Sequence, residues 1–551
     1  MKKMIVVVFA LMASLGVYAQ DDMPVVWENR LGHSIAFTGT GTEETGYSYA
    51  ASEKEFSLLD NKTGKVIWEK KFKDLAPKLG KIDELIPFWD ANTLFLFDRK
   101  MGKDVMACVE LSTGEYLWST NLYQDVNEDM IVYIPERDGF AITLKDKLVF
   151  VKTKTGEERW STSKFKGVVG QTVVSNDGYI VMVNFQPSLI GALFSGFKNQ
   201  IMKVNLENGD IVWENTYVGR AERKVISKEF LFDLSLDNNK VFLRLNGIQV
   251  YDYQTGAVLW SAAFDYTPEK LVGAPAGAKR FGVYNTVADP IVDGMDVYVL
   301  DMSSKKKQFI KKYDLNSGRL LWTSPEIKDG ARVIPSMYLM GDKIVLQIGG
   351  RVEAQAYIYK RERNADGSIT IYEETSITFP EVKPFGVQAF NTKDGSYAWE
   401  SERFRKGITN MISVDGKLIV CSGKALYSMN PDNGSENYEV PAAKGGVGEA
   451  TMIFPHKDKI VVVGEKGIST FDPTNGDLLN SGKYKTSALD AYFQDIVMMK
   501  TAKADIAAFD LNTGKYLEFK ARTGSNTSLS TTGDYVYVYE KKTVTKLKTK
   551  N

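Results

Sequence analysis

Short apolar runs separated by turn-forming residues dominate the chain. Examples are residues 147–151, 179–183, 343–347 and 459–463, which are rich in valine, isoleucine and leucine. These runs lack a strict alternation of apolar and polar positions, as expected for strands that are covered on both faces. No long stretch of helical periodicity competes with them. The pattern predicts an all-β protein made of many short strands.

A recurring turn motif follows many of these strands. It reads Asp-x-x-Thr-Gly at residues 60–64 and 252–256, and close variants recur along the chain. Aspartate and threonine can hydrogen-bond the turn backbone and glycine can adopt the left-handed conformation, so each copy predicts a tight hairpin. The glycines in this register are Gly64, Gly114, Gly156, Gly209, Gly256, Gly318, Gly395, Gly434, Gly476 and Gly514.

Tryptophan occupies the fourth position after seven of these glycines, although the whole chain has only nine tryptophans. The last three units carry Tyr438, Asn480 and Glu518 instead. An indole is large enough to bridge adjacent repeat units, so we interpret these side chains as structural docking residues. The set is Trp68, Trp118, Trp160, Trp213, Trp260, Trp322 and Trp399.

Groups of strands that restart the same hairpin are typical of a β-propeller, in which four-stranded blades bury their faces against their neighbours. A row of β-sandwich domains is the alternative, but sandwiches do not restart one hairpin so regularly. Ten hairpins and one composite unit give about eleven units. Familiar rings have about four to eight blades. The sequence therefore predicts one closed ring of eight or more blades, or two rings.

The two ends of the chain complement each other. Residues 25–30 resemble residues 211–216, which form the last strand of a unit, yet they precede the first unit. Residues 534–539 and 543–547 supply strands without a closing hairpin. We therefore expect the N-terminal strand 24–31 to complete the C-terminal blade, within a propeller domain that spans residues 20–551.

Residues 1–19 have the features of a signal peptide. Lys2 and Lys3 precede an apolar stretch, and Val17-Tyr18-Ala19 offers small residues at the two positions that a signal peptidase inspects. An N-terminal anchor helix is the alternative. No later segment is apolar for long enough to predict a transmembrane segment after signal removal. We expect an exported protein that is periplasmic, associated with the outer membrane, or secreted.

The repeat resembles the tryptophan-docking motif of the PQQ-repeat, or quinoprotein-like, β-propeller family, from about Trp27 to Lys548. That family includes quinoprotein alcohol dehydrogenases and the non-catalytic periplasmic propeller of the outer-membrane β-barrel assembly machinery. The resemblance to the second branch implies envelope protein partners, including outer-membrane assembly components. The dehydrogenase branch uses an adjacent cysteine pair and a Cys-x-x-Cys-His motif. This chain has neither of them. We therefore expect no cofactor.

Candidate catalytic chemistry is sparse. The only histidines are His33 and His456, interpreted as structural, with His456 on a surface turn. Most carboxylates lie in turns, where aspartate has a structural role, so we expect neither catalytic residues nor a metal site. Cys108 and Cys421 lie in apolar runs typical of a core. The 69 basic residues balance the 69 acidic ones, which argues against nucleic acid as a partner.

Some units are enlarged between their second and third strands, at residues 184–198, 303–308 and 351–384. Equivalent connections of a propeller emerge on one face, and enlarged loops there favour recognition. The insertion at 351–384 predicts its own hairpin. In the insertion at 184–198, apolar residues at helical spacing predict either a partner-binding helix or a short helix packed on the ring. They are Leu189, Ile190, Leu193, Phe194 and Phe197.

The sequence thus predicts an exported, non-catalytic propeller that binds protein partners through loops on one face. Two alternatives stay open. One is an enzyme similar to the PQQ-dependent dehydrogenases, and the other is a propeller that binds a glycan or another small ligand.

Overall fold

The computed structural model describes residues 21–550, except 101–102, 186–196, 225–228, 265, 267, 305, 329–331, 364–368, 485–487 and 502–503. The predicted signal peptide, residues 1–19, lies outside the described residues. Strands make up nearly all of the regular structure. Its short helical turns are α1 (Phe72–Leu75), η1 (Glu128–Met130), η2 (Pro135–Arg137) and η4 (Pro268–Lys270). In the described part of the chain, no helix has the length and apolar character that a membrane crossing requires.

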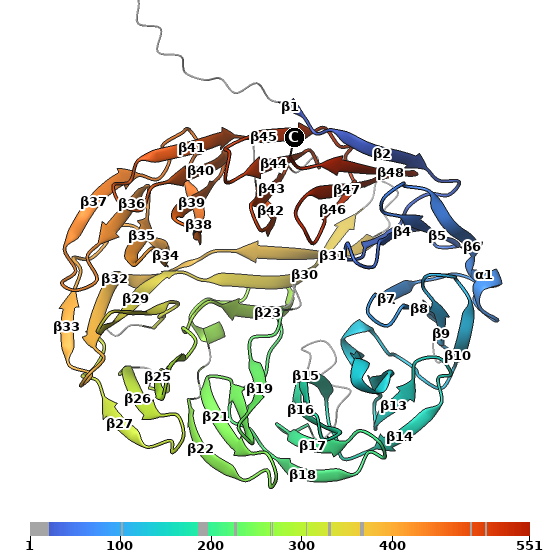
Figure 1. The fold of residues 1–551 in the computed structure, drawn as a ribbon, viewed down its shortest axis with the longest axis horizontal. Helices are drawn as coiled ribbons and strands as arrows, with labels where there is room; N and C mark the ends of the chain where they lie inside the picture. Colours follow the sequence, from blue (N-terminus) through green and yellow to red (C-terminus); the bar gives the residue numbers. More distant parts are fainter. Residues whose placement is uncertain are drawn as a thin grey trace, which may run out of the picture.

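Among the described residues, eleven sheets form one closed ring (Figure 1), and each of them contains four antiparallel strands. We number these sheets as blades 1 to 11 in chain order, with the first strand of each blade innermost. The all-β propeller predicted from the sequence is confirmed, and the eleven units belong to one ring. One blade carries an additional two-residue strand at its outer edge.

Blades 1 to 5 follow the order of the chain. Blade 1 contains β3 (Phe37–Thr40), β4 (Tyr47–Ala51), β5 (Glu55–Asp60) and β6 (Val66–Lys71). Blade 2 contains β7 (Glu84–Phe88), β8 (Thr93–Asp98), β9 (Val105–Glu110) and β10 (Tyr116–Thr120). Blade 3 contains β11 (Ile131–Ile134), β12 (Gly139–Thr143), β13 (Leu148–Lys152) and β14 (Glu158–Thr162). Blade 4 contains β15 (Val168–Val174), β16 (Tyr179–Phe185), β17 (Ile201–Asn205) and β18 (Ile211–Asn215). Blade 5 contains β19 (Asp233–Asp237), β20 (Lys240–Arg244), β21 (Gly247–Asp252) and β22 (Val258–Ala263).

Blades 6 to 11 include the insertion and the closure of the ring. Blade 6 contains β24 (Ile291–Asp293), β25 (Asp296–Asp301), β26 (Phe309–Asp314) and β27 (Leu320–Thr323). Blade 7 contains β28 (Met337–Met340), β29 (Lys343–Arg351), β32 (Glu381–Asn391) and β33 (Tyr397–Glu400). Blade 8 contains β34 (Ile408–Val414), β35 (Lys417–Ser422), β36 (Ala425–Met429) and β37 (Glu436–Pro441). Blade 9 contains β38 (Ala450–His456), β39 (Lys459–Gly464), β40 (Gly467–Phe471) and β41 (Leu478–Lys483). Blade 10 contains β42 (Ala488–Phe493), β43 (Ile496–Lys500), β44 (Ile506–Asp510), β45 (Tyr516–Phe519) and the added β1 (Asp21–Asp22). Blade 11 contains β46 (Asn526–Leu529), β47 (Tyr535–Glu540), β48 (Thr543–Lys548) and β2 (Val25–Arg30).

The second and third strands of the blades form the core. Their side chains pack against the blades on both sides, and Phe95 on β8 and Val149 on β13 are fully buried. This burial explains why these strands read as continuous apolar runs. Cys108 on β9 and Cys421 on β35 are buried and free, and burial raises the pKa of the Cys421 thiol to about 11.

The N-terminal segment joins two neighbouring blades. Strand β2 pairs antiparallel with β48, which places Val25 opposite Leu547 and Asn29 opposite Val544. Strand β1 pairs in parallel with β45, the outer strand of blade 10. The last blade is therefore built from both ends of the chain, so the ring has no open seam at β48.

A three-stranded sheet stands outside the blades. It consists of β23 (Ala278–Tyr284), β30 (Glu353–Arg363) and β31 (Ile369–Thr378). The hairpin predicted in the insertion is confirmed, since β30 and β31 pair antiparallel between β29 and β32 of blade 7. Strand β23 comes from the connection between blades 5 and 6. Viewed down the ring, β30 and β31 run across its middle (Figure 1). We call β23, β30 and β31 the central sheet.

Candidate functional site

The outer strands carry the tryptophans that join the blades. The Trp68 indole Nε1 on β6 donates to the Leu111 carbonyl of blade 2 at 3.0 Å, and Trp118 Nε1 donates to the Thr153 carbonyl of blade 3 at 2.8 Å. The same bond recurs at the following five blade boundaries. It joins Trp160 to Leu206, Trp213 to Tyr253, Trp260 to Leu315, Trp322 to Thr392 and Trp399 to Pro431.

Each of these indoles packs on the turn glycine of the next blade. A Cβ atom built on Gly114 would lie 3.0 Å from the ring of Trp68, and one built on Gly318 would lie 2.1 Å from Cγ of Trp260. Both glycines also have a positive φ, at 65° and 67°. The turn therefore needs glycine for its backbone conformation and for the close approach of the indole.

The seam of the ring uses the same contact. Trp27 Nε1 on β2 donates to the Asn61 carbonyl of blade 1 at 3.1 Å. Asn29 Nδ2 donates to the Gly64 carbonyl at 2.7 Å. Asn215 makes the equivalent bond to Gly256, also at 2.7 Å. Sequence reasoning left Trp27 out of the docking set, although the shared Trp-Glu-Asn tripeptide is the signal that could have found it.

The units without tryptophan keep part of this arrangement. Tyr438 Oη donates to the Pro473 carbonyl at 3.0 Å, which reproduces the indole bond with a phenol. Asn480 packs on Gly514, where an added Cβ would lie 2.5 Å from Oδ1 of Asn480. These contacts lie near the outer rim of the ring and serve the joining of blades.

The enlarged connections lie on one face of the ring. Strands alternate in direction within a blade. The connection from the second to the third strand therefore lies on the same face of the ring as the connection from the fourth strand to the next blade. On this face, which we call the decorated face, end the described strands β16, β18, β22, β25, β27 and β29, each of which is followed by a long connection in the sequence. The opposite face carries the short Asp-x-x-Thr-Gly turns. The additions therefore concentrate over blades 4 to 7.

The central sheet is anchored to these connections. Val283 of β23 and Ala354 of β30 are buried in one cluster with Val333 and Val352. Lys224, in the connection between blades 4 and 5, lies with its Nζ 3.6 Å from Oε2 of Glu353. The sheet is therefore held by side chains from several blades and does not depend on its own hairpin alone.

The end of β31 at the base of the hairpin, where the chain leads into β32, is apolar and exposed. Ile377 on β31 is 46% exposed, and Phe379, just beyond the strand, is 60% exposed. Strand β31 is also an edge of the central sheet in the part of the chain that the structure describes. Unpaired strand edges and exposed large apolar side chains are features that soluble proteins normally cover.

The helical candidates of the first insertion are described only in part. Leu189, Ile190, Leu193 and Phe194 lie outside the described residues. Phe197 is half-buried and packs against the core of blades 2 to 5. A Cβ atom on Gly167 would lie 2.7 Å from Cε2 of Phe197. Phe197 therefore packs onto the ring beside Gly167.

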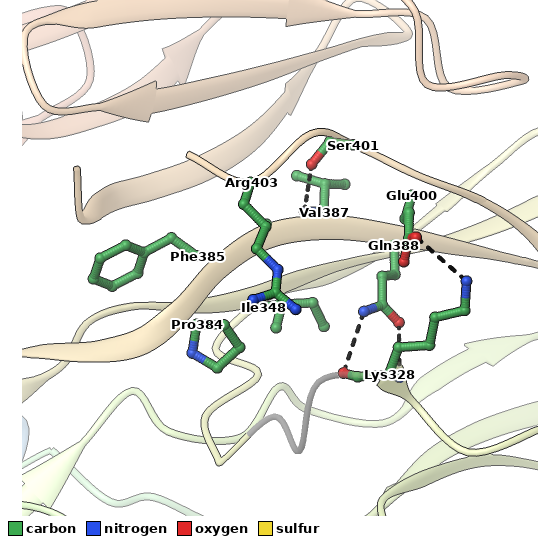
Figure 2. A pocket seen from close by; sticks show the side chains of 10 residues that line it. Lys328, Ile348, Pro384, Phe385, Val387, Gln388, Glu400, Ser401 and Arg403 are labelled. Carbon is green, nitrogen blue, oxygen red and sulfur yellow. Dashed lines mark hydrogen bonds and ion pairs between the residues drawn. The ribbon is translucent and has the colours of Figure 1, made fainter. Parts of the chain in front are cut away.

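A pocket of about 130 Å³ opens on the decorated face beside blade 7 (Figure 2). Ile348 on β29 and Val387 on β32 form an apolar floor and are almost fully buried. The backbone N–H of Lys328 donates to Gln388 Oε1 at 3.2 Å, and Gln388 Nε2 donates to the Lys328 carbonyl at 3.3 Å. The wall residues are Lys328, Ile348, Pro384, Phe385, Gly386, Val387, Gln388, Glu400, Ser401 and Arg403.

Charged side chains surround the mouth of this pocket. Figure 2 shows the Arg403 side chain extending toward Ile348 and Pro384. Lys328 Nζ lies 3.3 Å from Oε1 of Glu400 and 3.9 Å from the centre of the Tyr397 ring. Its interaction with Tyr397, followed by that with Glu400, raises the pKa of Lys328, so the ammonium is charged at neutral pH. The pocket combines an apolar floor with two cations and one carboxylate.

His33 lies in a hydrogen-bonded group that resembles a nucleophile with its base. His33 Nε2 is 2.7 Å from Ser57 Oγ, and Ser57 Oγ donates to Glu69 Oε2 at 2.6 Å. Ser57 is fully buried on β5, and its proton is directed to the carboxylate. A buried hydroxyl that donates to a carboxylate cannot pass its proton to His33 and cannot reach a substrate. The group has a structural role.

His456 departs from the expected surface position. It lies at a turn, but its side chain is buried between blades 9 and 10. Its Nδ1 atom is 2.9 Å from Tyr492 Oη, and its Nε2 atom is 3.0 Å from Asp495 Oδ1. The prediction of a surface side chain was wrong, because the turn of blade 9 packs against β42 of blade 10. Among the described residues, no three His, Cys, Asp or Glu side chains form a group that could hold a metal ion.

Comparison with known proteins places this architecture in a family. A ring of four-stranded sheets joined by tryptophan and glycine in this way is a propeller of PQQ-type repeats. The family described as outer membrane protein assembly factor BamB matches residues 52–229, 198–357 and 385–550. The chain therefore belongs to this family of PQQ-repeat propellers. No curated protein sequence matches the chain.

Matches among solved structures include a BamB protein, a computationally designed protein and a WD40 domain. The crystal structure of BamB from Moraxella catarrhalis is 15% identical, with coverage of 71% of this chain and 93% of that chain and a TM-score of 0.28. The designed Ika8 protein is 15% identical, with coverage of 71% and 100% and a TM-score of 0.34. The C-terminal WD40 domain of Sif2 is 11% identical, with coverage of 70% and 97% and a TM-score of 0.34.

Proposed function

We propose that this chain is an exported, non-catalytic propeller that binds protein partners in the periplasm or cell envelope through its decorated face. The observation that carries the proposal is the central sheet, an addition that the ring does not need for closure. A rigid scaffold with its enlarged connections gathered on one face is the usual arrangement of a recognition surface.

The exposed end of the central sheet supports a polypeptide partner. Ile377 and Phe379 expose apolar area next to the edge strand β31. A partner that covers these side chains removes apolar surface from water, and a strand laid beside β31 would also satisfy its edge hydrogen bonds. Among the described residues, the opposite face carries no sheet in addition to the blades.

The family supports the compartment and the kind of partner. Its description as an outer membrane protein assembly factor favours an envelope location and outer-membrane assembly components as partners. The predicted signal peptide, residues 1–19, is consistent with export. The proposal includes no cofactor and no catalytic residue, and the buried positions of His33, Ser57 and His456 favour binding over catalysis.

The test is site-specific photo-crosslinking in intact cells. A photoreactive amino acid placed at Phe379 should form crosslinks to one or a few envelope proteins. The same amino acid at Lys62, exposed in a turn on the opposite face, is the matched control and should give no such products. Equal products from both positions, or products from position 62 alone, would contradict the proposal.

A further inference from the structure

Basic side chains gather on the decorated face of blades 8 and 9. Strands β33, β35, β37, β39 and β41 end on this face, and the basic residues stand at these ends or on the connections that follow them. Their side chains are exposed, and among the described residues none of these side chains forms an ion pair. We call this set the basic arc, and it consists of Arg405, Lys406, Lys424, Lys444, Lys466 and Lys483.

Backbone contacts on blade 8 bring members of the basic arc side by side. The Gly423 N–H donates to the Gly407 carbonyl at 3.2 Å, and a Cβ atom on Gly423 would lie 2.8 Å from Cβ of Lys406. The Ala442 N–H donates to the Lys424 carbonyl at 2.9 Å. The connections 401–407, 423–424 and 442–449 therefore adjoin one another.

The row continues on blade 9. The Lys466 N–H donates to the Val447 carbonyl at 2.7 Å, which joins Lys466 to the connection that carries Lys444. A Cβ atom on Gly446 would lie 2.8 Å from Nζ of Lys483. The basic arc is therefore one continuous row over two blades, and it does not consist of scattered lysines.

This row has an excess of positive charge. The acidic residues on the same connections are Glu402, Glu449 and Glu465. Glu449 is already paired, since its Oε1 lies 3.1 Å from Nη2 of Arg351. The turns of the same two blades on the opposite face instead carry Asp415, Asp432, Asp458, Asp472 and Asp477. The chain as a whole has 69 basic and 69 acidic residues, so the excess reflects how charge is distributed between the faces.

The basic arc begins beside the exposed end of β31. Glu381 follows Phe379 by two residues, and a Cβ atom on Gly407 would meet the Glu381 carboxylate. Gly407 directly follows Lys406 of the basic arc. The exposed side chains of Ile377 and Phe379 therefore adjoin the row of cations. Only a polypeptide backbone can extend the edge strand β31, so this neighbourhood favours a polypeptide over a membrane surface.

We propose that the basic arc binds an acidic stretch of the polypeptide partner whose apolar residues cover Ile377 and Phe379. This inference deepens the proposed function and rests on it, because it specifies the chemistry of the same partner. Carboxylates opposite exposed ammonium groups speed the encounter and fix the register of the bound chain, whereas a basic segment is repelled.

Binding of defined probes to the purified mature protein tests the proposal. The probes are labelled octaglutamate and labelled octalysine, followed by fluorescence anisotropy, and vesicles of phosphatidylglycerol, followed by cosedimentation. We expect saturable binding of octaglutamate and none of octalysine or the vesicles. Binding should be lost in about 1 M salt, where the Debye length is roughly 3 Å.

Two double variants locate the binding. Lys424→Glu with Lys466→Glu should weaken octaglutamate binding about tenfold or more, because two attractive charges become repulsive. Both lysines are exposed, so the melting temperature should stay unchanged. Lys62→Glu with Lys65→Glu makes the same change of net charge at exposed positions on the opposite face, and it should bind as the wild type does.

The proposal is overturned if octaglutamate does not bind the folded wild type, or if the two double variants bind it equally well. Binding of the vesicles would also overturn it, since that result indicates an anionic membrane surface as the partner. None of these measurements uses the crosslinks from position 379, so failure of the basic arc and failure of the proposed function are distinguishable.

Discussion

Trp27 donates from Nε1 to the carbonyl of Asn61 at 3.1 Å, and this bond joins the last blade of the ring to the first. Trp27 stands on β2, close to the N-terminal end of the described chain, yet it belongs to the blade that the C-terminus builds. The seam therefore has the same chemistry as the internal blade boundaries. The ring closes by hydrogen bonds along β2 and by one indole packed on Gly64.

The docking indoles should contribute strongly to stability. Trp160 is 6% exposed, and it packs between blades while donating to Leu206. Trp160→Ala should lower the free energy of unfolding by about 3–5 kcal/mol, because a large buried side chain leaves a cavity. Chemical denaturation checks this. Tyr116→Ala, on another outer strand but 44% exposed, is the control and should change stability little.

The turn glycines should be required for space as well as for conformation. Gly318→Ala places a Cβ 2.1 Å from Cγ of Trp260, and Gly341→Ala places one with nothing within 4 Å. Both glycines have φ near 60°, so both substitutions carry a similar backbone penalty of about 1–2 kcal/mol. Gly318→Ala should cost a further 1–3 kcal/mol or so from overpacking.

Denaturation of the two alanine variants side by side measures the difference. Equal destabilisation of Gly318→Ala and Gly341→Ala would mean that the indole does not need the bare glycine. In that case the glycines of the motif would serve the turn conformation alone.

Removal of the closing strand should open the ring. A mature protein that lacks residues 20–31 loses β2, which leaves β48 as an uncovered edge. We expect a lower melting temperature and concentration-dependent aggregation. A synthetic peptide of residues 24–31 added in trans should raise the melting temperature again. An unchanged melting curve for the truncated protein would show that β2 is not needed for closure.

His456 should make stability depend on pH. Burial is the main cause that lowers its pKa below the ordinary value of 6.5, against the opposing effect of Asp495. The unfolded chain therefore binds the proton more readily than the folded protein does. Above pH 6.5 both states are neutral at this residue, and stability falls as the pH drops from 6.5 through the lower folded pKa.

The variant His456→Gln isolates this effect. It should unfold with a weaker pH dependence than the wild type below pH 6.5, and the difference between the two proteins should be constant above that pH. Urea denaturation at a series of pH values provides the measurement. Parallel curves for both proteins from pH 8 to pH 5 would count against the assignment to His456.

Local chemistry made the architecture predictable. The hairpin motif depends only on neighbouring residues, since Asp60 Oδ1 accepts a hydrogen bond from the backbone N–H of Thr63 within one turn. The continuous apolar runs follow from burial between blades. Both features can be recognised in short stretches of sequence. The fold class and the large number of units could therefore be predicted.

Features that join distant segments were not predictable in the same way. Strand β23 lacks the hairpin motif, and it becomes a strand because it pairs with β30, which lies about seventy residues further along the chain. The pocket brings Lys328 and Arg403 together from two different connections. The burial of His456 depends on the neighbouring blade. None of these relationships has a local pattern.

The exposed apolar end of the central sheet gives the most direct test of partner binding. Ile377→Ser combined with Phe379→Ser removes two exposed apolar side chains and should leave the melting temperature unchanged. Val66→Ser with Ile67→Ser does the same on the outer rim of blade 1 and serves as the matched control. The measurement is the yield of partner that copurifies after crosslinking in cells. We expect loss of partner from the first variant and wild-type yield from the second. Equal yields from both variants would show that Ile377 and Phe379 do not bind the partner.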